Sequence, residues 1–158
     1  MPKALAFLHK IVYNNLTKDD GERRREMIPL NEISTPALAY LGDCVIEMQV
    51  RERLVGQGLS KSGHLNSEAL RYVRASAQAD AMERILPLLT EDELRIYKRG
   101  RNSGHLNVPK SASPSQYRTA TGMEVLFGYL HLSKQTPRIA ELFEAAYPTN
   151  DGSTAETI

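Results

Sequence analysis

The run from Pro36 to Glu47 places one acidic residue, Asp43, in the middle of an otherwise apolar segment. Apolar side chains recur here at the three- and four-residue spacing of a core-facing helix: Leu38, Leu41, Val45 and Met48. Burying a carboxylate costs several kcal/mol unless hydrogen bonds, a cation or a metal offset it. Asp43 is therefore either a structural hydrogen-bond acceptor or part of a functional site.

The rest of the chain has the same helical character, with clear signals at the helix starts. Ser34 and Ser113 each stand just before a helix that has a proline in its first turn. Thr90 and Ser113 are each followed three residues later by Glu or Gln, which is the capping-box pattern. The expected helices span about residues 3–16, 36–55, a short piece after Ser60, 66–86, 91–100, 114–132 and 137–146. No segment alternates with period two, so we predict no strands and an all-α domain.

Length and composition limit the class of protein. A chain of 158 residues with 41% hydrophobic residues is long enough for one packed core. The single cysteine, Cys44, excludes an internal disulfide and lies in an apolar helix, so we expect it to be buried. No apolar run approaches the length of a membrane span, so we expect no membrane partner and a cytoplasmic protein. The proposed organisation is an N-terminal helix and charged linker over 1–33, one domain over 34–147 and a flexible tail over 148–158.

A second acid, Glu124, lies in a comparable apolar setting between Gly122 and Gly128. Glycines weaken a helix, so they are expected where two backbones approach closely. Each acid alone is more simply a structural acceptor or the partner of an arginine. Two carboxylates from two helices, beside a basic loop, favour a site for a hard divalent cation such as Mg²⁺. Glu47 shares a helix side with Asp43 but has Arg51 four residues away, so it ranks below Glu124.

Between the two acids lies a segment, Arg95 to Arg118, without any Asp or Glu. Its basic residues are Arg95, Lys98, Arg99, Arg101, His105, Lys110 and Arg118, and Tyr97 and Tyr117 flank the loop. This composition suits contacts with the phosphates of a nucleic acid, although a solvated surface has the same composition. A second basic set consists of Arg71, Arg74 and Arg84. Arg71 and Arg74 lie on one predicted helix face, which Gln78 extends. This set could flank a nucleic-acid groove, and pairing with Glu68 or Glu83 is an equal alternative.

Three blocks of this sequence resemble the ribonuclease III catalytic domain, and within it the short bacterial form, Mini-ribonuclease III. They are residues 37–43 (ALAYLGD), 98–102 (KRGRN) and 117–130 (YRTATGMEVLFGYL), and the resemblance covers about residues 34–147. It implies the all-helical endonuclease-domain fold, working as a homodimer that cuts both strands of double-stranded RNA. Tyr40 matches the position of an aromatic at the dimer contact.

The resemblance also implies the site chemistry. Asp43 and Glu124 match the family's catalytic, metal-binding acids, which would hold Mg²⁺, with Mn²⁺ able to substitute, and leave a 5′-phosphate. With the basic loop and the second basic set, it gives the expected RNA-binding residues: Lys98, Arg99, Arg101, Asn102, Lys110, Tyr117, Arg118, Arg74 and Gln78. The substrate implied is a precursor of large-subunit (23S) ribosomal RNA, and assistance by a ribosomal protein is left open.

Two departures from full-length ribonuclease III keep other interpretations open. Ala39 and Thr121 stand where the full-length enzymes carry further carboxylates, and no double-stranded-RNA-binding domain fits after residue 147. We therefore expect weak, salt-sensitive RNA binding by the catalytic domain itself. The alternatives are a non-catalytic RNA-binding or ribosome-associated protein with the same fold, and a helical adaptor in which Asp43 and Glu124 are structural acceptors.

Overall fold

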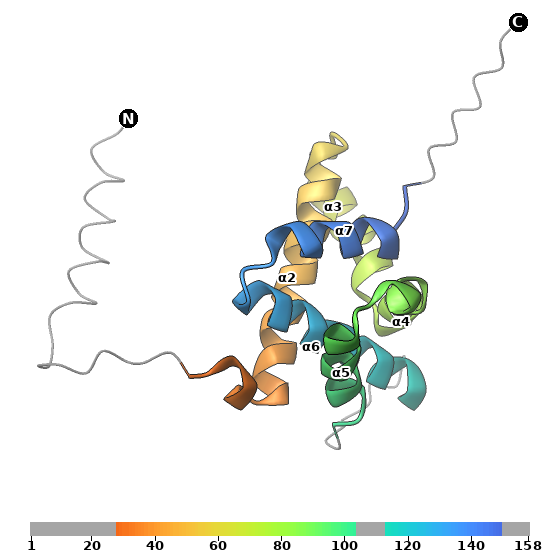
Figure 1. The fold of residues 1–158 in the computed structure, drawn as a ribbon. Helices are drawn as coiled ribbons and strands as arrows, with labels where there is room; N and C mark the ends of the chain where they lie inside the picture. The colour runs from red at the N-terminus through yellow and green to blue at the C-terminus, as the bar shows by residue number, and fades with distance from the viewer. Residues whose placement is uncertain (1–27, 104–112, 150–158) are drawn as a thin grey trace, which may run out of the picture.

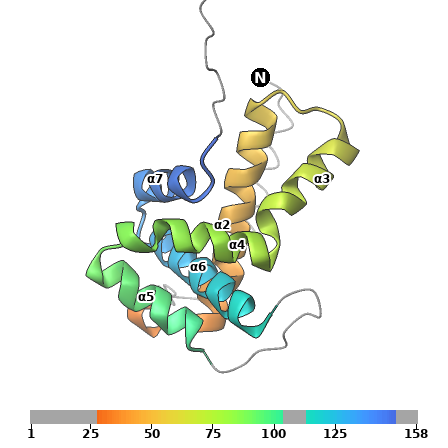
Figure 2. The same ribbon diagram turned by 90° about the vertical axis from the view of Figure 1, so that its right-hand side faces the viewer.

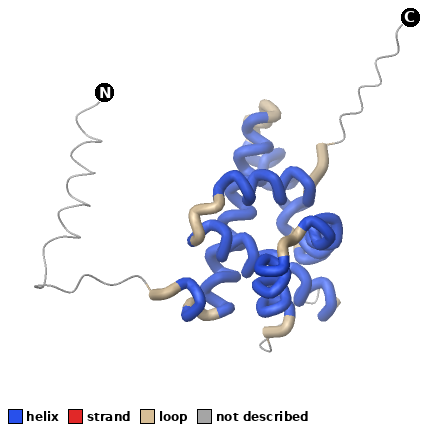
Figure 3. Tube along the Cα trace, viewed as in Figure 1, coloured by secondary structure: helices blue, strands red, loops and turns tan. Residues whose placement is uncertain are grey.

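A computed structural model describes residues 28–103 and 113–149, and every regular element in these ranges is helical. The elements are η1 (Leu30–Glu32), α2 (Thr35–Gly56), α3 (Ser62–Val73), α4 (Ala75–Ile85), η2 (Leu86–Leu88), α5 (Glu91–Arg101), α6 (Pro114–Leu132) and α7 (Thr136–Ala146). The all-α prediction is confirmed for the described ranges, as the absence of strands from Figure 3 shows. The helix expected over residues 3–16 and the charged linker after it lie outside them.

Helix α6 is the centre of the fold, and α2, α4, α5 and α7 all pack against it. Figures 1 and 2 show α6 running through the middle of the bundle, with α7 lying across one end. Its buried side chains include Met123, Leu126, Phe127 and Leu130, which are completely inaccessible to solvent. A helix that is buried nearly all round is apolar nearly all round, which is why an acid on it is unusual.

The predicted helix starts are confirmed by their hydrogen bonds. The Ser34 hydroxyl accepts from the backbone N–H of Ala37 at 3.3 Å. Thr90 and Glu93 form a complete capping box at the start of α5, and Ser113 and Gln116 form another at the start of α6. These local interactions satisfy backbone donors that the first helical turn leaves free, so they were readable from sequence.

The helix predicted over 66–86 is wrong in one respect, because the chain breaks at Arg74. This residue has an extended backbone conformation (φ −65°, ψ 145°), so α3 ends before it and α4 begins after it. The first of the two begins earlier than expected, at Ser62. Helix α3 packs on α2 whereas α4 packs on α6 and α7, and one straight helix could not make both sets of contacts.

Helix α2 has a different outward face from the one predicted. Cys44 is exposed rather than buried, and Met48 also lies outside the core. Tyr40 is 82% exposed. Together, Tyr40, Cys44 and Met48 recur every four residues and form one outward-facing strip, which we call the α2 strip. The core side of the same helix is formed by Leu38, Val45, Ile46, Val50 and Leu54.

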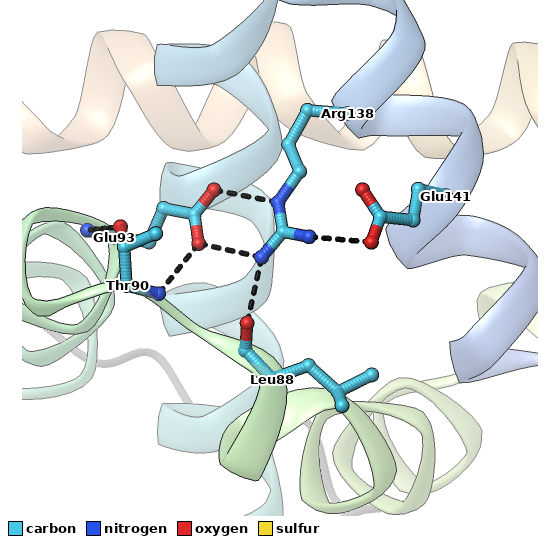
Figure 4. A network of polar contacts seen from close by, with 5 residues as sticks. All are labelled: Leu88, Thr90, Glu93, Arg138 and Glu141. Carbon is cyan, nitrogen blue, oxygen red and sulfur yellow. Dashed lines mark hydrogen bonds and ion pairs between the residues drawn. The ribbon is translucent and has the colours of Figure 1, made fainter.

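A buried ion pair between Arg138 and Glu93 connects α7 to α5 (Figure 4). The Arg138 guanidinium donates to both carboxylate oxygens of Glu93, at 2.8 and 2.9 Å, and to the carbonyl of Leu88 at 2.7 Å. The side chains of Arg138 and Glu93 are only 19% and 7% exposed. Glu93 also accepts from the backbone of Thr90, so the ion pair and the α5 cap are one network. Among the described helices, none is both long and apolar enough to span a membrane.

Candidate active site

The two candidate acids meet because α2 and α6 cross with their backbones in contact. A Cβ atom added at Gly42 would overlap the carbonyl oxygen of Glu124, and one added at Gly128 would overlap the carbonyl oxygen of Leu38. The close approach expected at Gly128 is therefore confirmed. Asp43 follows Gly42 directly, so the crossing places its side chain beside Glu124.

Helix α5 reaches α6 by the same means. A Cβ atom at Gly122 would lie 2.5 Å from Cε2 of Tyr97, and one at Gly100 would lie 2.7 Å from Cβ of Val125. The close approach expected at Gly122 is thus confirmed too, with α5 as the neighbour. The basic C-terminal end of α5 is held against the helix that carries Glu124.

Glu124 is a half-buried carboxyl group without a compensating charge. Burial, followed by the negative charge of Asp43 as the second cause, raises its pKa from 4.5 to about 8. Among the described residues it makes no ion pair and no side-chain hydrogen bond. A carboxyl group with this pKa is protonated at neutral pH. A cation bound beside it would lower its pKa and stabilise its ionised form.

Asp43 differs from the expectation of a buried acid, because the residue is exposed. Partial desolvation still raises its pKa, followed by repulsion from Glu47. The pKa values of both carboxyl groups are thus raised, and in each case loss of solvent is the main cause.

Glu47 does not join the pair as a free carboxylate. Its Oε1 atom lies 2.5 Å from Nη2 of Arg51, one helical turn later. The pairing expected from the four-residue spacing is confirmed. Glu47 acts on the site as a nearby negative charge that raises the pKa of Asp43.

A cavity of about 380 Å³ lies beside Glu124 at the N-terminal end of α2. Its lining residues are Thr35, Pro36, Ala39, Ser103, Tyr117, Thr121 and Glu124. Glu124 is the only charged residue among them. Sequence reasoning missed Thr35 and Ser103, because they come from segments far apart in the chain and share no spacing signal. Ala39 and Thr121, the two departures from full-length ribonuclease III, both line this cavity.

The donor set fits a hard divalent cation with few protein ligands. The described ranges contain no group of three or more His, Cys, Asp and Glu residues that could hold a metal ion. Asp43 and Glu124 together supply two carboxylates, and Mg²⁺ is commonly bound by one or two carboxylates with the remaining positions filled by water and substrate. Hydroxyl groups on the cavity wall suit such water molecules.

The residues expected to bind RNA lie in different surroundings in the structure. Lys98, Arg101 and Asn102 are exposed at the C-terminal end of α5, and Arg118 is exposed on the first turns of α6. Tyr117 lines the cavity next to Glu124. Lys110 lies outside the described residues, so its expected role stays a prediction.

Arg99 is occupied by contacts within the chain. Its Nε atom donates to the Thr35 hydroxyl at 3.1 Å, and Nη2 donates to the carbonyl of Ile33. These bonds join α5 to the start of α2. Arg99 thus holds one wall of the cavity in place, a role that the sequence alone did not indicate.

The second basic set does not form the continuous face that was predicted. Gln78 is 1% exposed, so the expectation that it extends an exposed face is wrong. Arg74 is exposed at the break between α3 and α4, where its Nε donates to the carbonyl of Leu70 at 3.0 Å. Arg71 pairs with Glu68 at 3.0 Å, which was the alternative considered for it.

Known proteins resemble this chain over most of the described residues. Residues 36–135 match the family model of the ribonuclease III domain. A Mini-ribonuclease 3 of Symbiobacterium thermophilum is 45% identical over 118 residues, covering 73% of this chain and 91% of the relative. A Mini-ribonuclease 3 of Enterococcus faecalis is 46% identical, covering 67% of this chain and 82% of that relative.

A solved structure agrees with these sequence matches. The crystal structure of a Fusobacterium nucleatum protein superposes with a TM-score of 0.67 at 28% identity, covering 72% of this chain and 92% of that one. Residues 36–135, which match the family model, include both acids, the glycine crossing and every lining residue of the cavity beside Glu124 except Thr35. The chain belongs to the ribonuclease III domain family and, within it, to the Mini-ribonuclease 3 proteins.

Proposed function

We propose that this protein is a magnesium-dependent endoribonuclease that hydrolyses phosphodiester bonds in double-stranded RNA, leaving 5′-phosphate and 3′-hydroxyl ends. The observation that carries the proposal is the pair of carboxyl groups, Asp43 and Glu124, which the glycine crossing brings together without a neutralising partner among the described residues. Membership of the family supports the same activity.

The chain's own residues prepare the site for a cation and a phosphate. Burial raises the pKa values of both carboxyl groups, so positive charge entering the site stabilises their ionised forms. Magnesium, when bound by these two residues, would supply an activated water and neutralise charge on the leaving oxygen. Thr35 lines the same cavity as Glu124 and accepts a hydrogen bond from Arg99, so that the cavity keeps its shape as RNA binds.

The RNA duplex would be held mainly through its phosphates. Lys98, Arg101, Asn102 and Arg118 are exposed at the ends of α5 and α6 that border the cavity, and Lys110 belongs to the same basic segment. Contacts of this kind release counterions, so affinity should fall steeply as salt rises. Tyr117 lines the same cavity as Glu124, which supports a contact of its side chain with the ribose or phosphate next to the cleaved bond.

We further propose that the active form is a homodimer formed through the α2 strip. An apolar strip with a tyrosine that is 82% exposed is costly to leave in water. The strip lies on the same helix as Asp43, so a two-fold contact here would bring two acid pairs near one duplex, one for each strand. Residues 34–147 would be the catalytic unit, with 1–33 and 148–158 outside it.

For the natural substrate we propose a precursor of large-subunit (23S) ribosomal RNA, the substrate implied by the resemblance to Mini-ribonuclease III. Whether a ribosomal protein assists is a question for the same assay. The second candidate is a non-catalytic RNA-binding protein with this fold. It is favoured by the small number of acids, since Ala39 and Thr121 place no carboxylate on the cavity wall.

The test is cleavage of a long RNA duplex and of a ribosomal RNA precursor, each with Mg²⁺ and with EDTA. The proposal expects cutting only with Mg²⁺ and products that a 5′-phosphate-dependent exonuclease degrades. Tight RNA binding without cutting of either substrate in Mg²⁺ or Mn²⁺ would establish the non-catalytic alternative.

A further inference from the structure

A cavity of about 600 Å³ lies among the C-terminal part of α2, helices α3 and α4, and the segment after α7. It shares no lining residue with the cavity beside Glu124. Along α2, Arg53 at this cavity is ten residues beyond Asp43, which corresponds to roughly 15 Å of helix. The cavity is therefore separate from the candidate active site but within reach of the same large ligand.

The charged lining of this cavity is predominantly basic. Arg53 comes from α2, Arg71 from α3 and Arg84 from α4, and Asp80 is the single acid. Gln57 and Tyr72 add neutral polar groups. Glu144 and Glu68, which do not line the cavity, pair with Arg53 and Arg71. Arg84 makes no ion pair among the described residues, so its positive charge is left to attract an anion beside the other two guanidinium groups.

Arg53 forms a fixed floor. Its side chain is 8% exposed, its Nη2 lies 2.7 Å from Oε2 of Glu144, and its guanidinium stacks 4.6 Å from the centre of the Phe143 ring. Beside it, the Tyr147 hydroxyl donates to the carbonyl of Tyr72 at 3.1 Å. These contacts hold the positive charge of Arg53 at the base of the cavity.

Arg71 and Arg84 are the exposed arginines of this cavity, and each has N–H donors left for a ligand. Arg71 pairs with Glu68 at 3.0 Å, in a contact where the arginine side chain is 69% exposed. Arg84 donates Nη1 to the carbonyl of Ala146 at 3.0 Å. A guanidinium has five N–H donors, so each arginine has further donors to offer an incoming ligand.

We propose that this cavity, the arginine pocket, binds backbone phosphates of the RNA substrate at a distance from the bond that is cut. The planar fork of arginine matches the oxygens of a phosphate. A duplex presents a negative charge about every 1.7 Å of its axis, so an RNA seated at the acids carries many phosphates beyond them. The choice of RNA as the ligand rests on the proposed function.

Binding of a long, fluorescently labelled RNA duplex in EDTA, where the proposed function predicts no cutting, tests this inference. Arg71→Ala should weaken binding several-fold and lower the slope of log affinity against log salt by about one. Asp80→Asn removes the only acid of the pocket and should tighten binding, a gain that misfolding could not produce. Arg51→Ala is the matched control: this arginine is 66% exposed, pairs with Glu47 four residues earlier and lies outside the pocket.

Equal affinity of the Arg71→Ala and Arg51→Ala variants, or no gain for Asp80→Asn, would overturn the inference. The outcome is separable from the proposed function. If the protein cuts RNA but the pocket variants bind like the control, only the arginine pocket is wrong. If the variants differ as expected but no condition gives cutting, the pocket stands and the nuclease proposal fails.

Discussion

The ionisation of Glu124 links the chemistry of the site to the stability of the fold. Its folded pKa of about 8 lies above the ordinary value of 4.5, so the folded state binds more protons than the unfolded state between these two pH values. Without divalent cations, the stability contributed by this group is full below about pH 4.5 and is lost as pH rises through 8. A divalent cation bound beside Glu124 would reduce this loss of stability, because it stabilises the ionised carboxylate.

Replacing the carboxyl with an amide should reveal this cost. We expect Glu124→Gln to raise the free energy of unfolding by roughly 1–3 kcal/mol at pH 9 in EDTA, and to have little effect at pH 5. Urea unfolding at the two pH values measures it, with Glu83→Gln as the control, because Glu83 is exposed and makes no ion pair among the described residues. A loss of stability at pH 9 would mean that Glu124 is a structural acceptor, as the adaptor hypothesis requires.

Individual residues also show which features of the site could be predicted from the sequence and which could not. Asp43 and Glu124 were identified as a pair because each interrupts an apolar helix, a signal that lies within one segment. Cys44 and Gln78 were assigned to the wrong sides of their helices, because both α2 and α4 carry small or apolar residues on more than one side. The bonds of Arg99 to Ile33 and Thr35 join residues more than sixty positions apart, and no local pattern encodes them.

At the scale of helices, the crossing of α2 and α6 determines whether the acids can work together. A methyl group at Gly128 would overlap the carbonyl of Leu38, which is backbone and cannot move aside. We expect Gly128→Ala to lower stability by roughly 2–4 kcal/mol and to abolish cleavage by separating the helices. Gly63→Ala in α3 is the control, because nothing lies near its added methyl group, and it should stabilise by about 0.5–1 kcal/mol. Similar effects of both changes would contradict the close crossing.

The ion pair between Glu93 of α5 and Arg138 of α7 gives a second prediction at the scale of helices. Arg138→Ala would leave Glu93 buried without its cation, so we expect a loss of roughly 2–4 kcal/mol in the free energy of unfolding. The Arg138 hydrogen bond holds the pKa of Glu93 below its usual range, with burial opposing it, so this stability is present at neutral pH and disappears on acidification through the folded pKa. Thermal unfolding at pH 7 and pH 3 measures both effects. A variant as stable as the wild type at pH 7 would show that the network contributes nothing.

Helix starts were predictable, and the break at Arg74 was not. Caps at Ser34, Thr90 and Ser113 depend on side chains within three residues of the start, which a sequence shows directly. The extended backbone at Arg74 has no capping side chain and no Gly or Pro at the break. It is set by the different packing partners of α3 and α4, which exist only in the folded molecule.

For the whole molecule, the family and its helical fold followed from three sequence blocks, and the same resemblance assigned Tyr40 to a dimer contact. The exposure of Cys44 and Met48 beside it was not readable, because both lie in an apolar helix and Met48 belongs to its predicted core-facing stripe. If the α2 strip is the dimer contact, Tyr40→Glu should convert a dimer to a monomer in sedimentation velocity at micromolar concentration, because it places a charge in an apolar interface. Leu70→Glu, at an exposed apolar position on α3, is the control and should leave the assembly unchanged. If the wild-type protein sediments as a monomer, the proposed dimer is wrong.

Single-turnover cleavage of an RNA duplex in saturating Mg²⁺ by the Asp43→Asn, Glu124→Gln and Glu47→Gln variants tests the central claim most directly. Asp43 and Glu124 form the metal site in this account, whereas Glu47 is paired with Arg51. The account predicts that the first two variants fold and lose at least about a hundredfold in rate, while Glu47→Gln cuts within a few-fold of the wild type. Retained cleavage by a folded Asp43→Asn or Glu124→Gln variant would contradict it.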